Sequence, residues 1–150
     1  MKKVVLLGGG NVAYHLAQRL MGNPQYQLIQ LYNRSPLSAA FDAIAVEKTT
    51  QLEALFPADI YILSVKDDAI AALSEQLPFE GRLVVHTSGS VPMQALSACQ
   101  RRGVFYPLQS FSIAQAVDFS KVPFCLETEE VADYALLEGL AKVFSPKCYA

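Results

Sequence analysis

Short apolar runs alternate with segments of helical periodicity along this chain of 150 residues. The apolar runs predict strands at residues 3–7, 28–32, 44–46, 58–65, 83–85 and 103–106, with two more at 122–126 and 147–150. Helical segments are expected at residues 12–20, 37–43, 67–77 and 130–144, after Pro92, and as one turn at 51–56. Residues 107–121 are polar and predict an irregular connection. This alternation predicts an α/β fold with a doubly wound, mainly parallel sheet.

The first predicted strand ends in a glycine turn that is typical of dinucleotide-binding domains. Gly8, Gly10 and Ala13 follow the G-x-G-x-x-A spacing, with Asn11 and Val12 opening the helix. Gly8 allows a tight turn, and Gly10 lets a pyrophosphate approach the backbone because it has no Cβ. The free N–H groups of the helix would bind the phosphates. We therefore predict a Rossmann NAD(P)-binding domain over residues 1–150. The alternative is a glycine-rich turn that binds nothing.

The residues after the second strand bear on the choice between NAD and NADP. NAD-binding domains usually place Asp or Glu about 20 residues beyond the glycines, where it binds the ribose 2′-hydroxyl. Here that place holds Asn33, Arg34 and Ser35. A carboxylate would repel a 2′-phosphate, whereas a guanidinium and a hydroxyl bind it through charge-assisted hydrogen bonds. The sequence favours NADP over NAD, and the alternative for Arg34 is a solvated loop arginine.

Three later strand ends carry candidate substrate-site residues, because ligands of open α/β sheets bind at the carboxyl ends of strands. These ends are Ser64-Val65-Lys66, His86-Thr87-Ser88 and Tyr106-Pro107-Leu108-Gln109-Ser110. Val65 and Lys66 border the nicotinamide half of a bound cofactor, and the alternative for Lys66 is a surface lysine at a helix start.

Histidine and serine supply the candidate chemistry at these ends. His86 could transfer a proton to or from a substrate. The alternative is a structural histidine bonded to a loop carbonyl. Ser88 and Ser90 could bind a substrate or simply shape their glycine-containing turn. The second histidine, His15, lies off the apolar stripe of the first helix and is expected to be exposed and without function.

Composition and charge narrow the class of protein. The chain is 52% hydrophobic and 17% charged, with a net charge of −2 and no basic run, which favours a large core and argues against nucleic-acid partners. No apolar stretch reaches the roughly 20 residues of a membrane span, and the amino terminus is expected to be structure rather than a signal peptide. Three widely spaced cysteines, Cys99, Cys125 and Cys148, predict no metal site and a reduced, cytoplasmic protein with buried or inert thiols.

Several motifs together resemble one protein superfamily. They are GGGNVA after the first strand, NRS after the second, SVKDDAI after the fourth, HTSGS after the fifth and YPLQSFS after the sixth. The chain resembles the Rossmann half of the pyrroline-5-carboxylate reductase and deazaflavin-dependent NADP reductase superfamily. The most similar branch consists of bacterial NADP oxidoreductases with a helical carboxyl-terminal domain of unknown function.

The resemblance implies a ligand for each of several residues. Gly8, Gly10, Asn11 and Val12 would hold the pyrophosphate; Asn33, Arg34 and Ser35 the 2′-phosphate; Val65 and Lys66 the nicotinamide ribose; and His86, Ser88 and Gln109 the substrate. It also implies that the helical domain, which lies beyond this chain, dimerises relatives and closes their substrate pocket. The strand-like end at Ala150 is consistent with that expectation.

Three functions are compatible with the sequence, the most remote being a domain that uses the same crevice for a different nucleotide. The first is the cofactor-binding domain of an NADP-dependent oxidoreductase that moves hydride to or from a small C=N or C=O substrate. The second is a module that senses NADP(H), or interacts through it, without catalysing a reaction. The second remains open because no obvious Lys, Asp or Glu cluster accompanies the strand ends.

Overall fold

The strands form one mixed sheet of Rossmann topology. In the computed structural model, which describes residues 1–150, eight strands lie in the order β3-β2-β1-β4-β5-β6-β7-β8. Their bounds are β1 Lys2–Leu7, β2 Tyr26–Tyr32, β3 Glu47–Thr49, β4 Ile60–Leu63, β5 Leu83–His86, β6 Arg101–Pro107, β7 Phe124–Thr128 and β8 Cys148–Tyr149. Only β6 and β7 pair antiparallel. The predicted mainly parallel, doubly wound sheet is confirmed, and strand order reverses between β1 and β4.

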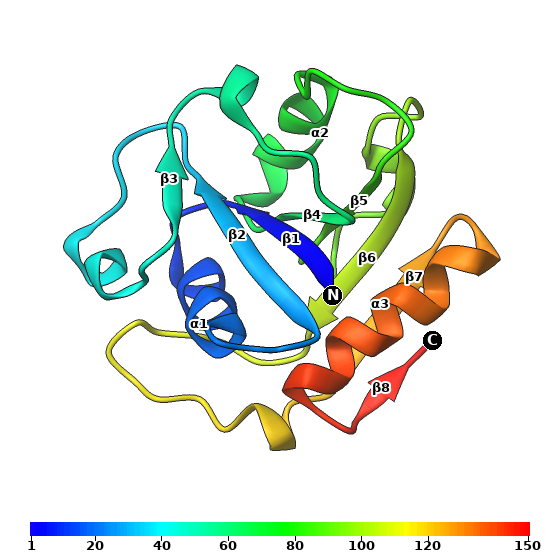
Figure 1. Ribbon diagram of the computed structural model, residues 1–150. Coiled ribbons are helices and arrows are strands. Elements are labelled where there is room, and N and C mark those ends of the chain that lie inside the picture. The colour runs from blue at the N-terminus through cyan, green and yellow to red at the C-terminus, as the bar shows by residue number, and fades with distance from the viewer.

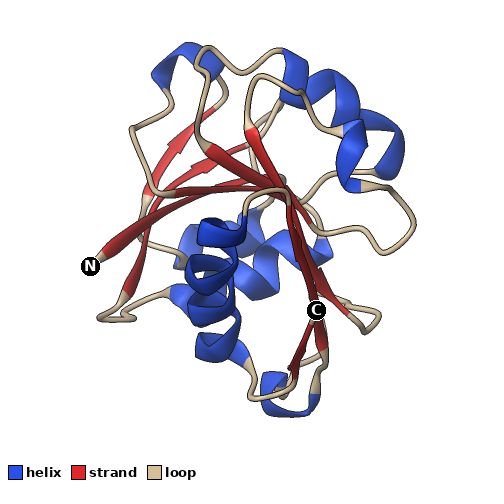
Figure 2. Ribbon diagram, turned by 90° about the vertical axis from the view of Figure 1, so that its right-hand side faces the viewer, coloured by secondary structure: helices blue, strands red, loops and turns tan.

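Helices cover both faces of this sheet (Figure 1 and Figure 2). The helices α1 (Asn11–Leu20) and α3 (Val131–Phe144) pack on one face, and α2 (Asp67–Glu75) packs on the other. Alternate residues of β1 point to opposite faces: Val4 and Leu6 join the core under α1 and α3, whereas Val5 and Leu7 join the core that contains Ile70 of α2. The unbroken apolar strand is therefore buried on both sides.

Several short elements differ from the sequence prediction. The third strand lies at Glu47–Thr49 rather than at residues 44–46, because Ile44 is buried in the larger core instead of pairing with β2. The expected short helices are single 3-10 turns, and the expected helix after Pro92 is only a turn. These turns are η1 (Ala39–Ala43), η2 (Leu52–Ala54), η3 (Met93–Ala95) and η4 (Phe119–Lys121).

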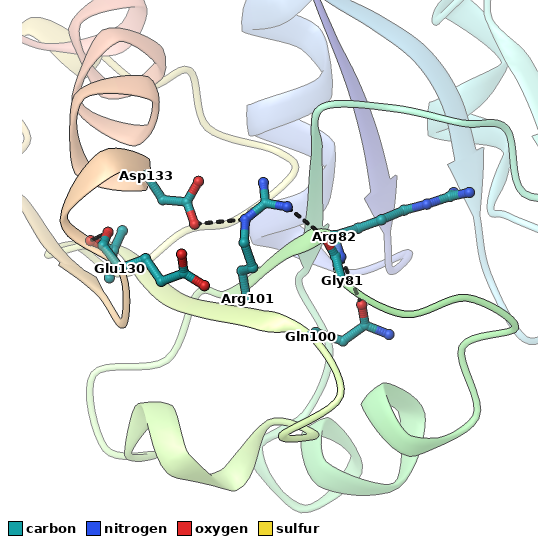
Figure 3. Close-up of polar contacts among 7 residues, drawn as sticks. Gly81, Arg82, Gln100, Arg101, Glu130 and Asp133 are labelled. Carbon is teal, nitrogen blue, oxygen red and sulfur yellow. Dashed lines mark hydrogen bonds and ion pairs between the residues drawn. The ribbon is translucent and has the colours of Figure 1, made fainter.

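Polar contacts tie α3 to the amino ends of β5 and β6 (Figure 3). Arg101 donates from Nε to Asp133 Oδ2 at 2.9 Å and from Nη1 to the Gly81 carbonyl. Beside it, the Arg82 N–H donates to Gln100 Oε1 at 3.2 Å. These contacts lie at the edge of the sheet opposite the glycine turn, so they stabilise the fold and leave the carboxyl edge free.

Candidate cofactor-binding site

The glycine turn is wedged between β2 and β4. The Gly8 N–H donates to the Tyr32 carbonyl at 2.8 Å, and the Ser64 N–H donates to the Leu7 carbonyl at 2.7 Å. Gly8 has φ +141°, and a Cβ on it would lie 2.0 Å from the Ser64 carbonyl oxygen. Because neither that backbone angle nor that space suits a side chain, glycine is required at this position.

Beyond the turn, the amino end of α1 is open and uncapped. Gly10 is the N-cap residue; no side chain caps this helix, and no acidic residue lies in its first turn. An ideal Cβ on Gly10 would meet no atom within 4 Å. The N–H groups of Asn11 and Val12 belong to the first turn, which lacks intrahelical acceptors. Open space, free N–H groups and the positive end of the helix dipole together fit a pyrophosphate.

The loop after β2 lies against the glycine turn. The Asn33 amide packs beside Gly9, where an added Cβ would come within 2.9 Å of Asn33 Nδ2, and it donates to the Ser35 carbonyl at 2.9 Å. Arg34 is exposed, and its guanidinium makes no hydrogen bond or ion pair. Asn33 therefore shapes the loop, while Arg34 and Ser35 leave a free guanidinium and a free hydroxyl beside the space for a dinucleotide.

The carboxyl ends of β4 and β5 are joined by a polar network. Val65 is half-buried and Lys66 is exposed just before α2. The Ser90 hydroxyl donates to Asp67 Oδ2 at 2.8 Å, and the Ser88 hydroxyl lies 3.3 Å from Ser90 Oγ. Hydrogen bonds from Ser90 and Ser88 hold the pKa of Asp67 below its usual value. Asp67 is thus an ionised member of this site that was not among the residues predicted from the sequence.

His86 is the least accessible of the predicted substrate-site residues. Its side chain is fully buried, and Nδ1 accepts a hydrogen bond from the Ser88 N–H at 3.1 Å. Nε2, which then carries the proton, has no hydrogen-bond partner. Burial lowers the pKa of His86, although the backbone of Pro92 and Val91 opposes this effect. The ring is therefore neutral near pH 7 and is held by its own loop.

Gln109 lies in the connection formed by residues 108–118, just beyond the end of β6. It is exposed, and no hydrogen bond joins it to His86 or Ser88. The 108–118 loop runs beside α1 (Figure 1), where Asn11 Nδ2 donates to the Phe111 carbonyl at 3.0 Å. A hydrogen bond therefore joins Ser88 to His86, and none joins Gln109 to either residue.

The prediction that His15 is exposed is wrong. His15 is 3% exposed, and its Nε2 lies 2.6 Å from the carbonyl oxygen of Ser112, to which it donates. Its ring also packs against Phe111, with centroids 5.8 Å apart. The apolar periodicity of the helix predicts His15 outside the core, but the 108–118 loop covers its ring. The hydrogen bond from His15 to Ser112 therefore holds this loop against α1.

The cysteines are all free; Cys99 is exposed, and Cys125 and Cys148 are half-buried. Burial raises the pKa of Cys148. No group of three or more histidine, cysteine or acidic side chains is placed to hold a metal ion. None of the helices has the length and apolar character needed to cross a bilayer.

Comparison with known proteins identifies the family. Residues 3–89, which include the glycine turn and the strand ends at Lys66 and His86, match the family described as NADP oxidoreductase coenzyme F420-dependent. The chain belongs to this family. The match confirms the resemblance drawn from the motifs and makes this chain a Rossmann domain of the NAD(P)-dependent oxidoreductase type.

A solved structure similar to this NADP oxidoreductase-family domain belongs to a longer chain. A Bacteroides fragilis protein, provisionally described as an NADP oxidoreductase, is 36% identical with a TM-score of 0.86, over 99% of this chain and 60% of that one. No curated protein matches the chain.

More distant structures share the fold alone. Prephenate dehydrogenase from Aquifex aeolicus, solved with hydroxyphenyl propionate and NAD+, is 17% identical with a TM-score of 0.77, over 100% of this chain and 60% of that one. Pyrroline-5-carboxylate reductase from Coxiella burnetii is 18% identical with a TM-score of 0.70, over 99% of this chain and 58% of that one. The chain therefore spans about 60% of the length of these proteins.

Proposed function

We propose that this chain is the NADP(H)-binding domain of an oxidoreductase that transfers hydride between NADP(H) and a small C=O or C=N compound. The observation that carries the proposal is the open, uncapped amino end of α1 beside Gly10, with the unpaired Arg34 one strand away. Membership of a family described by NADP and coenzyme F420 supports it. Neighbours that bind NAD+ make the 2′-phosphate preference the part most in need of a test.

Each predicted cofactor residue has a task in this proposal. The N–H groups of Asn11 and Val12 would bind the pyrophosphate that Gly8 and Gly10 admit, and Arg34 and Ser35 would bind the 2′-phosphate. Val65 and Lys66 lie at the end of β4, next to β1 in the sheet, on the path toward a nicotinamide.

The chemistry comes mainly from the cofactor. When bound, the nicotinamide supplies or accepts the hydride, while the substrate heteroatom gains or loses a proton. The protein orients the reactants and keeps them near the ends of β4 and β5. Relatives of greater length suggest that a further domain completes the substrate pocket and forms a homodimer, and we place the whole protein in the cytoplasm.

One observation favours a second candidate, a module that binds NADP(H) without reducing a substrate. The only histidine at the strand ends, His86, is buried and neutral, and the nearest carboxyl, Asp67, is ionised. Neither group is suited to give a proton to a substrate in this chain alone. Tight NADPH binding with no turnover in a full-length protein would favour this candidate.

Calorimetric titration with NADPH and NADH tests the proposal. We expect tighter binding of NADPH, and we expect Arg34→Asp to weaken NADPH binding by about 1–3 kcal/mol, the scale of a charge-assisted hydrogen bond. Binding of NADH should change far less. Arg19→Asp is the matched control, because Arg19 is exposed in the last turn of α1, at the opposite end from the site.

Two results would contradict the proposal in different ways. No heat with either coenzyme on folded protein would remove the cofactor site itself. An NADPH-to-NADH affinity ratio that is unchanged in Arg34→Asp would leave the site and remove the role of Arg34.

A further inference from the structure

A cavity of about 500 Å³ lies next to the Ser88 network, over the face of β6 and β7 that no helix covers. Its polar lining comes from Ser88, Ser90, Tyr106 and Glu127, and Val91 and Val104 add apolar surface. Its volume is in the range of small-molecule sites. The cavity borders the strand ends where a substrate is expected, so the chemistry of its walls bears on what it binds.

The serine hydroxyls turn their lone pairs, rather than their protons, toward this cavity. The Ser90 hydroxyl donates its proton to Asp67 at 2.8 Å. The Ser88 hydroxyl lies 3.3 Å from Ser90 Oγ and also contributes a hydrogen bond toward Asp67, so its proton is directed into the same network. Ser88 Oγ also accepts from the Ser90 N–H at 3.2 Å. Both hydroxyls are left with acceptor capacity only.

Glu127 adds an unneutralised negative charge to the lining of the cavity. Its side chain makes no hydrogen bond or ion pair, whereas Glu129, just beyond the end of β7, is paired with Arg102, and Asp133 of α3 is paired with Arg101. No lysine, arginine or histidine lines the cavity. Asp67, behind Ser90, supplies a second negative charge, and both carboxylates lie close enough to His86 to influence it.

We propose that this cavity binds the ammonium group of a small organic amine. An ammonium group carries only donors, and it would meet the lone pairs of Ser88 and Ser90 and the carboxylate of Glu127. The amine's carbon chain would contact Val91 and Val104. A carboxylate ligand would instead face two like charges and no cation. That this amine is the substrate rests on the proposed function; that the cavity binds it does not.

The test uses three four-carbon probes, n-butylammonium, n-butanol and butyrate, which are titrated at neutral pH and constant ionic strength while backbone amide resonances are recorded. Butylammonium should shift the signals of Ser90 and Glu127 and bind about tenfold more tightly than butanol, as expected for a charge-assisted hydrogen bond. Butyrate should cause no saturable shift. Equal or tighter binding of butyrate, or no shift with butylammonium at any concentration that leaves the protein folded, overturns the proposal.

Two variants identify the groups responsible. Glu127→Gln keeps the shape of the side chain and should weaken butylammonium binding about tenfold. Glu130→Gln removes the same charge from a residue outside the cavity and should leave butylammonium binding unchanged. Equal effects of both variants, or no effect of either, overturn the assignment to Glu127. NADPH calorimetry on the same samples keeps the two proposals separate, because either ligand can bind when the other does not.

Discussion

Gly8 and Gly10 are two residues apart in the same turn, yet an added methyl group meets different surroundings at each. A Cβ on Gly8 would lie 2.0 Å from the carbonyl oxygen and 2.8 Å from the carbonyl carbon of Ser64. A Cβ on Gly10 would meet nothing within 4 Å. The same substitution to alanine should therefore act on folding at one position and on cofactor binding at the other.

The magnitude for Gly8→Ala has two parts. A backbone with φ +141° costs a non-glycine residue about 1–3 kcal/mol. The overlap with Ser64 costs about 1–3 kcal/mol more, as in an overpacked core. Ser64 cannot move away cheaply, because its N–H is bonded to the Leu7 carbonyl at 2.7 Å. We expect a total loss of about 2–6 kcal/mol in the free energy of unfolding.

Gly10→Ala should cost much less stability. Gly10 has φ −94°, which alanine adopts without strain, and only the preference of the N-cap position for glycine is lost, below about 1 kcal/mol. The new methyl group would instead occupy the open space that a pyrophosphate needs. We expect NADPH affinity to fall by at least about tenfold, or 1.4 kcal/mol.

Urea unfolding followed by far-ultraviolet circular dichroism measures the first effect, since the chain has no tryptophan. A lower midpoint at an unchanged slope reports a true loss of stability. Calorimetry with NADPH measures the second effect. Equal losses of stability in the two variants would refute the account of Gly8. Wild-type NADPH affinity in Gly10→Ala would refute the placement of the pyrophosphate.

Two further predictions concern His86 and the aromatic core. Burial lowers the pKa of His86, so below about pH 6.5 the unfolded chain binds a proton that the folded chain does not, and stability should fall as the pH drops toward 5. His86→Gln should flatten this part of a pH series of urea midpoints, and an unchanged slope would contradict the burial argument. Phe124 is fully buried among the rings of Phe105 and Phe144, at centroid distances of 5.1 and 5.5 Å. Phe124→Ala should therefore lower the free energy of unfolding by about 3–5 kcal/mol. Val131→Ala, at a residue 90% exposed, should change it by less than about 0.5 kcal/mol, and similar losses in both variants would show that burial is not the cause.

Local patterns were sufficient for the central part of the fold. The apolar runs of β1 and β4 and the glycines between β1 and α1 each determine their structure within a few residues. The short elements were harder, because distant contacts fix them. Ile44 has the apolar character of a strand residue, but it is buried in the larger core, while the pairing with β2 passes to Glu47–Thr49. Pro92 is a good helix start, yet only the turn η3 follows.

The residues of the candidate site also differ in whether their position depends on local sequence or on distant contacts. Gly8, Gly10 and Arg34 could be predicted because their spacing from one strand or turn determines their place. His15 could not, since its burial depends on Ser112, 97 residues later. Asp67 and Glu127 were not predicted either. Asp67 meets Ser90 only because β4 and β5 are neighbours in the sheet, and Glu127 reaches the cavity because β7 pairs antiparallel with β6. No local pattern reports that convergence.

The fastening of the 108–118 loop over α1 bears on the order of folding. Its two hydrogen bonds, from Asn11 to Phe111 and from His15 to Ser112, join residues 100 and 97 positions apart. Closing so long a loop is entropically costly, and contacts of high sequence separation form slowly. As the chain leaves the ribosome, β1, α1 and β2 can assemble well before Phe111 and Ser112 are synthesised. We therefore expect the nascent domain to pass through a stage in which α1 is formed but the 108–118 loop does not yet lie against it.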